Sequence, residues 1–378
     1  MDLDFTEEQE TLRDMVRRVC NEHAPLDVVR AMENDPTGYP TEFWKQLAEL
    51  GILGILIPEE YDGADMSMLD AVIVYEEFGR SLAPTPHFVS AILGAGALLA
   101  AGSAEQKKEW LPQIASGEAI LTPAWLEPER GYGPGGVQMK AELEGDEIRL
   151  SGTKRHVHFA SAATRLVVLA RTGAGEEDID LLLVDPNASG VTLTQQLSLA
   201  ADTQYRVDFE DVRVPAGSRI GAAGSGWKTW KQAMLDGILL AAALASGGAA
   251  QALEITCEYA KEREQFGKPL AAFQAISHYL ADASTTISGA TTLVCEAAWA
   301  RTQGRPVDRL APMAKLFACQ TYRDVTAMAE QVWGGVGFSI EYDIQLYFRR
   351  AKSLQLSWWD TRYLEELIAS DVLDGETA

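Results

Sequence analysis

Residues 259–279 read YAKEREQFGKPLAAFQAISHY, and they mark a sharp break between two long helical segments. The first segment ends at Gly267, a residue type that readily adopts the left-handed conformation found after helix C-termini. Pro269 then interrupts the helical pattern, and Gln274 opens the next helix. Outward from this break, helical patterns cover residues 227–262, 272–303, 307–333 and 357–370. Four long helices joined by short loops predict a helical bundle.

Upstream of this bundle the hydrophobic period changes from 3.6 to 2. Residues 1–118 show helical spacing, with Thr6–Gln9 and Ser103–Gln106 as capping boxes. Residues 119–222 contain short alternating or apolar runs separated by Gly and Pro, which favours a small β-barrel or sandwich. We therefore predict an α+β, mostly α protein, divided into a helical domain, a β domain and a helical bundle at residues 1–118, 119–222 and 223–378.

The composition excludes some classes of partner. The 378 residues include 55 Asp and Glu against 32 Lys and Arg, a net charge of −23. So acidic a surface repels nucleic acid and anionic membranes, and we expect neither as a partner. The apolar stretch from Gly237 to Leu253 is short and rich in Ala, Gly and Ser, so it predicts a buried helix rather than a membrane span. The acidic N-terminus is unlike a signal or transit peptide, and we expect a cytoplasmic protein.

The cysteines indicate a protein without disulfides. Cys20, Cys257, Cys295 and Cys319 are far apart and form no CxxC pair. Metal and disulfide frameworks both need closer clustering, so reduced, mostly buried thiols are the better interpretation.

The break at residues 259–279 has two interpretations. Arg263 is suited to a bidentate contact with a phosphate, Phe266 to covering an aromatic base, and Gln274 to a nearby hydrogen bond. A helix C-terminus whose Lys and Arg complement the helix dipole, followed by a turn, accounts for the same residues. The residue types alone leave both open.

Two later segments are equally ambiguous. Residues 331–337, QVWGGVG, follow no strand and lack the glycine spacing of a Rossmann fingerprint. Their adjacent glycines either let backbone amides approach a phosphate or end a helix. Arg349, Arg350 and Lys352 form a basic cluster, which is either a solvated face or an anion site.

Several segments in this order resemble the acyl-CoA dehydrogenase family, and the resemblance covers the whole chain. The matching segments are FTEEQETLRD (5–14), PEEYDGADMS (58–67), YEEFGRSLA (75–83), GSAEQKKEWLPQIASGE (102–118), LSGTK (150–154), FEDVRVPAGSRIG (209–221), EREQFGKPLAAFQ (262–274) and QVWGGVGFSIEYDIQLYFRRAK (331–352). The fold implied is an N-terminal helical domain, a middle β-barrel and a C-terminal four-helix bundle.

The resemblance also implies a cofactor and its contacts. In this family FAD lies extended across a subunit interface, and the neighbouring subunit holds its pyrophosphate and adenine. The residues of this chain that match those contacts are Arg263, Phe266, Gln274, Gln331, Gly334 and Gly335. This half of the flavin site is intact in the sequence.

The catalytic base of the family is missing. Its reaction needs a carboxylate that takes a proton in a dry pocket, at one of two positions. The usual position, in a Tyr-Glu-Gly turn, falls on Trp358, and the other, early in the first bundle helix, falls on Gly237. Asp236 and Asp360 are nearby carboxylates, but a shift of one residue on a helix rotates a side chain by about 100°.

Contacts to the chain's own flavin and substrate are also replaced. Ile238 stands where the family commonly places an Arg that grips acyl-CoA, and Leu126 stands where a Thr or Ser precedes Glu-Pro. His156-Val157-His158 replaces a Trp-x-Thr/Ser pattern that lines the flavin ring. Two histidines at i and i+2 share a face of a strand, as polar strand residues or, with a third ligand, as metal ligands.

The losses are therefore selective, and the pattern is similar to that of small non-catalytic subunits of heteromeric bacterial acyl-CoA dehydrogenases acting on pimeloyl-CoA or steroid side chains. We predict a partner in an α/β heterotetramer with a homologous catalytic subunit, acyl-CoA as substrate and an electron-transfer flavoprotein as acceptor. One alternative is a self-sufficient homo-oligomer whose base is displaced to Asp236 or Asp360. Another is a scaffold without a redox role.

Overall fold

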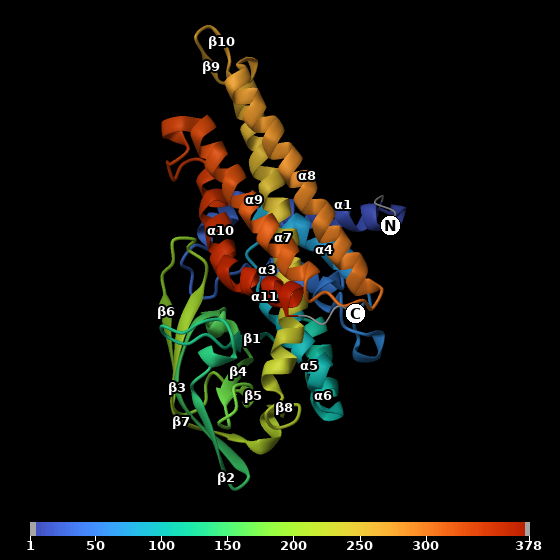
Figure 1. Ribbon diagram of the computed structural model, residues 1–378, viewed down its shortest axis with the longest axis vertical. Helices are drawn as coiled ribbons and strands as arrows, with labels where there is room; N and C mark the ends of the chain where they lie inside the picture. Colours follow the sequence, from blue (N-terminus) through green and yellow to red (C-terminus); the bar gives the residue numbers. More distant parts are fainter. Residues whose placement is uncertain (1–4, 375–378) are drawn as a thin grey trace. The chain divides into compact units, whose positions relative to one another are not determined.

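The computed structural model describes residues 5–374 (Figure 1). These residues pack as two compact units. One unit contains the chain up to Val29, Ser67–Ala83 and everything from Ile238 onward, and the other contains Arg30–Met66 and Pro84–Gly237. The N-terminal helices are therefore shared between a helical unit and a unit built around the β-sheet.

The N-terminal part is helical, as predicted. Its helices are α1 Glu7–His23, α2 Leu26–Ala31, α3 Thr41–Glu49, α4 Met68–Ser81, α5 Ala95–Ala101 and α6 Ala104–Ala115. The predicted capping boxes at Thr6 and Ser103 are confirmed, since each hydroxyl accepts from the N3 amide while the N3 glutamine accepts from the cap amide. A third box, in which Ser67 pairs with Asp70, begins α4.

The middle part is one eight-stranded sheet, in the order β6-β7-β3-β2-β4-β5-β8 with β1 parallel to β4. The strands are β1 Leu121–Ala124, β2 Lys140–Glu144, β3 Glu147–His158, β4 Arg165–Arg171, β5 Ile179–Val184, β6 Val191–Gln196, β7 Gln204–Pro215 and β8 Arg219–Ile220. Inward-facing residues such as Leu150, Val168 and Val207 are fully buried in one apolar core. The long β3–β7 pair has register shifts at Leu150/Gly152 and Lys154/Val157.

The C-terminal part contains α7 Gly226–Glu262, α8 Gln274–Thr302, α9 Leu310–Trp333, α10 Ile344–Leu356 and α11 Thr361–Leu373. The four predicted helices are present, and α10 is an additional helix that the hydrophobic pattern does not predict. The buried side of α10 includes Gln345 and Gln355 beside Ile344 and Tyr347, so its apolar pattern is weak. Helix α7 is long and apolar enough to cross a membrane by length and composition, but 83% of its most apolar window is buried.

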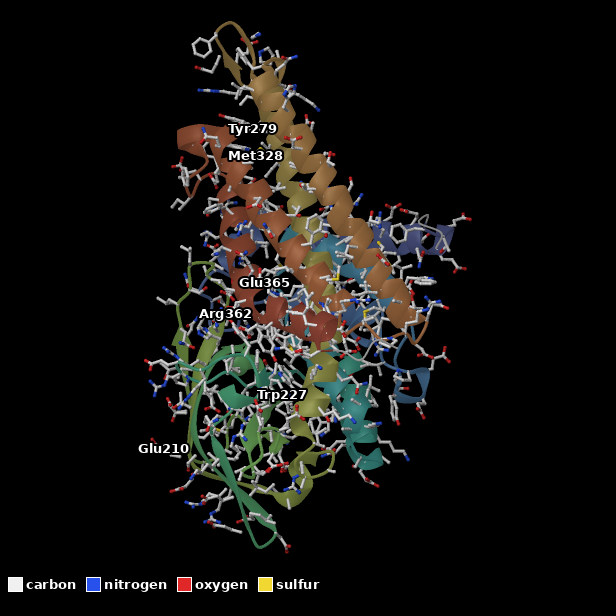
Figure 2. The ribbon with its side chains drawn as sticks, in the orientation of Figure 1. Glu210, Trp227, Tyr279, Met328, Arg362 and Glu365 are labelled. Atoms are coloured by element: carbon white, nitrogen blue, oxygen red, sulfur yellow. The ribbon has the colours of Figure 1, made fainter. Side chains whose placement is uncertain are left out.

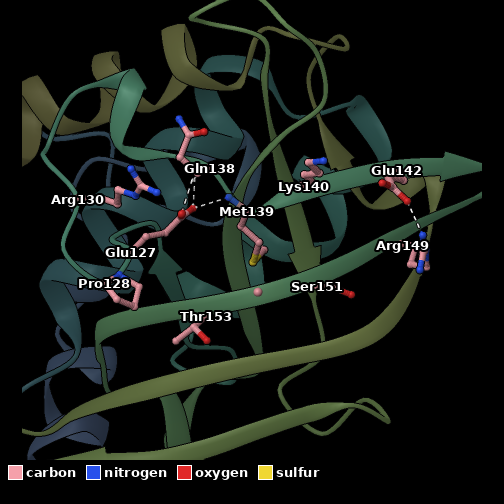
Figure 3. Close-up of a pocket in the computed structure, with 11 residues that line it drawn as sticks. Glu127, Pro128, Arg130, Gln138, Met139, Lys140, Glu142, Arg149, Ser151 and Thr153 are labelled. Atoms are coloured by element: carbon pink, nitrogen blue, oxygen red, sulfur yellow. Dashed lines mark hydrogen bonds and ion pairs between the residues drawn. The ribbon is translucent and has the colours of Figure 1, made fainter.

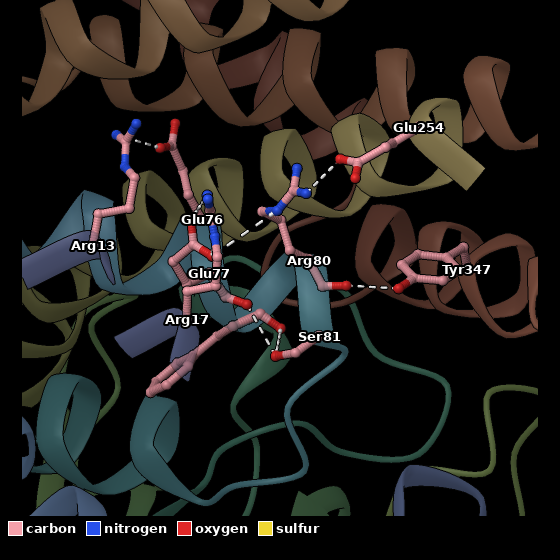
Figure 4. A network of polar contacts seen from close by, with 9 residues as sticks. Arg13, Arg17, Glu76, Glu77, Arg80, Ser81, Glu254 and Tyr347 are labelled. Carbon is pink, nitrogen blue, oxygen red and sulfur yellow. Dashed lines mark hydrogen bonds and ion pairs between the residues drawn. The ribbon is translucent and has the colours of Figure 1, made fainter. Parts of the chain in front are cut away.

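Ion pairs join α1, α4 and α7 within the helical unit (Figure 4). The buried carboxylate of Glu77 accepts two hydrogen bonds from Arg17, at 2.9 and 2.7 Å, and Arg80 contacts Glu254 on α7 at 2.6 Å. Glu76 lies 3.3 Å from Arg13, and burial nevertheless raises the pKa of Glu76 to about 7. The contact at Glu254 ties the later part of α7 to α4, and the end of the same helix carries part of the candidate site.

Candidate cofactor site

A short hairpin connects the end of α7 to the start of α8 (Figure 1). Its strands are β9 Glu264–Gln265 and β10 Lys268–Pro269. Its two central residues, Phe266 and Gly267, have φ of 52° and 77°. This left-handed pair suits the twist of a two-residue hairpin turn. It also points the Phe266 ring into solvent, where 93% of the residue is exposed.

Arg263 and Gln274 flank this hairpin and are exposed. Within residues 5–374 the structure gives neither side chain a hydrogen bond or an ion pair. An Arg that only capped its own helix would be expected to contact the last carbonyls. The guanidinium and the amide are therefore available to a group from outside this chain.

The second predicted segment is the turn after α9. Gly334 has φ 66° and ψ −145°, a conformation that only glycine adopts easily. A methyl group added at Gly334 or Gly335 would meet no atom within 4 Å, so the space beside the backbone is open. Gln331, one turn earlier, is exposed and has no side-chain partner among the described residues.

An aromatic stack fixes this turn to α7. The rings of Trp333 and Tyr259 are 4.0 Å apart and nearly parallel, at 10°. The indole Nε1 of Trp333 donates to Thr256 at 3.2 Å, and the Tyr259 hydroxyl donates to the Trp333 carbonyl at 3.4 Å. The six predicted cofactor contacts thus come from two segments of the same unit, and each segment has residues exposed to solvent.

The predicted position of the catalytic base is filled by a tryptophan. Trp358 and Trp359 connect α10 to α11 with φ of 55° and 70°, and they are only 8% and 0% exposed. The buried ammonium of Lys315 holds this turn by donating to the carbonyls of Ser357 at 2.9 Å and Trp359 at 2.8 Å. Asp360 is the N-cap of α11, where it accepts from the Tyr363 amide at 3.0 Å. A capping carboxylate at a helix start is poorly placed as a mobile base.

The second base position also has no carboxylate. An added Cβ at Gly237 would lie 2.6 Å from Leu93 Cδ2 and 3.4 Å from the Phe88 ring, so apolar side chains occupy that space. Ile238, which replaces the expected Arg, is fully buried. Asp236 is half-buried on the same helix.

A buried ion pair stands beside Leu126 in the β unit. Lys154 Nζ donates to Glu127 at 2.7 Å, and Glu127 also accepts from the amides of Gln138 and Met139, at 2.9 Å each. Burial lowers the pKa of Lys154 to about 8, against the opposing effect of Glu127. Glu127 is one of the residues that line an open pocket of about 470 Å³. Figure 3 draws these lining residues. This pair was not predicted from the sequence, although Lys154 lies in the matching segment at residues 150–154 and Glu127 directly follows Leu126.

The two histidines have polar partners on the neighbouring strand segment. His156 Nδ1 lies 2.8 Å from Gln204 Oε1, and His158 Nε2 lies 3.4 Å from an oxygen of Asp202. Burial lowers the pKa of His158. Residues 5–374 contain no group of three or more His, Cys, Asp or Glu placed to hold a metal ion. The geometry therefore favours polar strand residues over metal ligands.

The remaining sequence features are structural. Arg349 and Lys352 of the basic cluster donate to Gln345 and Gln355 on their own helix, at 2.8 and 2.9 Å. None of the four cysteines forms a disulfide; Cys20 and Cys319 are buried and the other two half-buried.

Comparisons with known proteins agree with this architecture. Family models of the acyl-CoA dehydrogenase N-terminal, middle and C-terminal domains match residues 6–118, 123–212 and 224–359. A probable acyl-CoA dehydrogenase, YngJ of Bacillus subtilis, is 34% identical over 99% of this chain and 100% of its own length.

Solved structures show the same fold. Butyryl-CoA dehydrogenase from Megasphaera elsdenii is 28% identical, with a TM-score of 0.92 over 99% of this chain and 100% of that one. A chain of the ChsE4-ChsE5 complex from Mycobacterium tuberculosis is 28% identical, with a TM-score of 0.89 over the full length of both. The chain belongs to the acyl-CoA dehydrogenase family of FAD-dependent oxidoreductases.

Proposed function

We propose that this chain is the non-catalytic subunit of a heteromeric acyl-CoA dehydrogenase. It would hold the diphosphate and adenine of an FAD whose ring is bound by a homologous catalytic subunit. FAD, when bound, supplies the acceptor for a hydride from the acyl chain. The proposal rests mainly on one observation: the two positions for the family's base carry Trp358 and Gly237.

The contacts that this chain would make are of three kinds. Arg263 carries a permanent charge and paired donors that suit a diphosphate. The 93% exposed ring of Phe266 offers a face to an adenine. The open backbone at Gly334 and Gly335 lets amide groups approach an anion closely. The lack of internal side-chain partners for Arg263, Gln274 and Gln331 supports a role for them between subunits.

The partners follow from the same proposal. The substrate is an acyl-CoA thioester, and the assembly is a heterotetramer with a homologue that keeps its Glu. A relative from Acetobacterium woodii, 29% identical, is named as the CarC subunit of a caffeyl-CoA reductase-Etf complex, which supports an electron-transfer flavoprotein as acceptor. We also propose a cytoplasmic location; the burial of the apolar stretch of α7 argues only against that helix spanning a membrane.

The test compares the chain purified alone with the chain co-expressed with a homologue that retains the catalytic Glu. The single chain should carry little flavin and give no turnover with an artificial electron acceptor, whereas the pair should carry FAD and turn over. Turnover by the single chain that is lost in Asp236→Asn or Asp360→Asn would replace the proposal with the homomeric alternative. If the co-expressed pair binds neither FAD nor acyl-CoA, the remaining hypothesis is a scaffold protein without a redox role.

Two arginine variants make the test specific. Arg263→Ala should lower the FAD content of the co-expressed pair without preventing its assembly. Arg362→Ala removes a charge from an 87% exposed side chain on α11, labelled in Figure 2, and should leave the FAD content unchanged. Equal FAD content in both variants would contradict the assignment of Arg263.

A further inference from the structure

A buried carboxyl group lies directly beneath the Gly-rich turn. Glu330, in the last turn of α9, is 3% exposed, and neither of its oxygens has a hydrogen-bond partner among residues 5–374. A Cβ added at Gly337 would lie 2.4 Å from Glu330 Oε2, so the glycine leaves room for this carboxyl. Buried polar groups without partners are rare and call for an explanation.

The position disfavours the charged form of Glu330. A carboxylate at the C-terminal end of a helix meets the negative end of the helix dipole. Burial raises the pKa of Glu330 to about 7, and no charged neighbour contributes to that shift.

The neighbouring elements supply no counter-charge. The ionisable side chains that pack at this end of α9 are Tyr259 on α7 and Tyr342 in the following loop, whose rings contact Trp333, and Glu341 and Asp343 flank Tyr342 in the sequence. None of them makes a hydrogen bond or ion pair with Glu330. The neutral acid is therefore the form that this environment accommodates.

Glu330 immediately precedes Gln331 and the open backbone of Gly334 and Gly335. A diphosphate bound to that backbone carries negative charge close to the carboxyl, and like charges at short range in a poorly solvated place repel strongly. We infer that a diphosphate-bearing cofactor binds to this turn only when Glu330 is protonated, so that the cofactor and one proton bind together. Glu330 is then a positioning residue that acts through the turn. The inference rests on the proposed cofactor role of the turn but not on which subunit carries the catalytic base.

The experiment titrates FAD into the flavin-binding assembly, heteromeric or homomeric, after removal of its flavin. Binding is followed by fluorescence quenching between pH 6 and pH 9. Affinity of the native assembly should fall by up to about tenfold per pH unit above neutrality, the limit for linkage to one proton. Glu330→Gln should bind FAD with little pH dependence. Glu341→Gln, which neutralises an exposed acid on the adjacent loop, should follow the native curve.

Calorimetry at pH 8 in buffers of different ionisation enthalpy provides the second measurement. The native assembly should take up about one proton per FAD, and Glu330→Gln should take up none. The same pH slope in Glu330→Gln and the native assembly, or no proton uptake in the native assembly, overturns the inference while FAD binding itself still stands. Tight FAD binding that Arg263→Ala leaves unchanged would instead overturn the proposed role of these segments.

Discussion

The buried ion pair between Glu127 and Lys154 is expected to matter for the stability of the fold. The side chain of Lys154 is 0% exposed, and its ammonium forms an ion pair with the Glu127 carboxylate. The same carboxylate accepts hydrogen bonds from two backbone amides. Removing one partner of such a pair leaves an uncompensated charge in a medium that solvates it poorly.

We expect Glu127→Gln to reduce the free energy of unfolding by about 3 kcal/mol, because the Lys154 cation then lacks its counter-ion. The double variant Glu127→Gln/Lys154→Met should recover part of that loss, since no charge remains buried. Urea denaturation followed by circular dichroism measures both. Glu60→Gln, at an exposed acid of the same unit, serves as the control. A single variant as stable as the native chain would show that the pair contributes little.

Glu330 also affects the pH dependence of stability. Its folded pKa of about 7 lies above the value of 4.5 for a free side chain. Its stabilising contribution is therefore complete below pH 4.5 and is lost as the pH rises through 7. We expect Glu330→Gln to melt at the native temperature at pH 4.5 and at a higher temperature than the native chain at pH 8. If Glu330→Gln shifts the melting temperature equally at pH 4.5 and pH 8, Glu330 is not a buried neutral acid. The control Glu341→Gln should leave the melting temperature unchanged at both pH values.

At the scale of elements, helix starts were predictable where the capping residues follow the usual pattern. Thr6 and Ser103 each precede a glutamine at the third helical position, and both boxes form. The box at Ser67 was not predicted because its third residue is Asp70 rather than Glu or Gln. Asp70 also accepts from Gln9 of α1 at 2.9 Å, a contact that sequence spacing cannot reveal.

We expect Ser67→Ala to cost about 1 kcal/mol of stability, the usual effect of losing a side-chain N-cap. Thermal or chemical unfolding of the isolated chain measures it. Ser370→Ala is the matched change at an exposed position inside α11 and should be neutral or slightly stabilising, since Ala is the better helix former. Equal effects of the two substitutions would show that the capping box does not hold α4.

The missed element and the missed ion pair have different causes. Helix α10 escaped prediction because two glutamines lie on its buried side, which hides the apolar period. Glu127 and Lys154 are 27 residues apart, and only the pairing of the sheet brings them together. Local pattern therefore predicted most helices and the change to strands, whereas side-chain partners distant in sequence had to come from the fold.

At the scale of the whole molecule, the net charge of −23 is the dominant electrostatic property. Like charges on a compact surface repel one another, and the repulsion is relieved when the chain expands. We expect the melting temperature of the isolated chain to rise between about 0.01 M and about 0.5 M NaCl, because salt shortens the screening length. Differential scanning calorimetry at constant pH measures the shift. A fall in melting temperature would mean that attractive surface pairs outweigh the excess of acidic groups.

The candidate cofactor residues were predicted from the resemblance to the family. The structure adds their exposure to solvent and their hydrogen-bond partners. Composition alone could not distinguish a capped helix end from an anion site at Arg263. The structure leaves that guanidinium without an internal partner, which favours the anion site. The proposed loss of the base depends on counting Trp358 from a matching segment, and the fold shows that the turn is packed around two tryptophans.

The helical unit also has apolar side chains that are exposed to solvent when the chain is not bound to a partner. Phe266, Phe338 and Ile340 are 93%, 70% and 81% exposed. Chaperones and proteases act on chains that display such groups. Under the proposed function, copies made in excess of the catalytic subunit would be recognised as orphans and degraded. The cellular level of this chain would then depend on the amount of catalytic subunit. Degradation of the excess would set the ratio of the two subunits after translation.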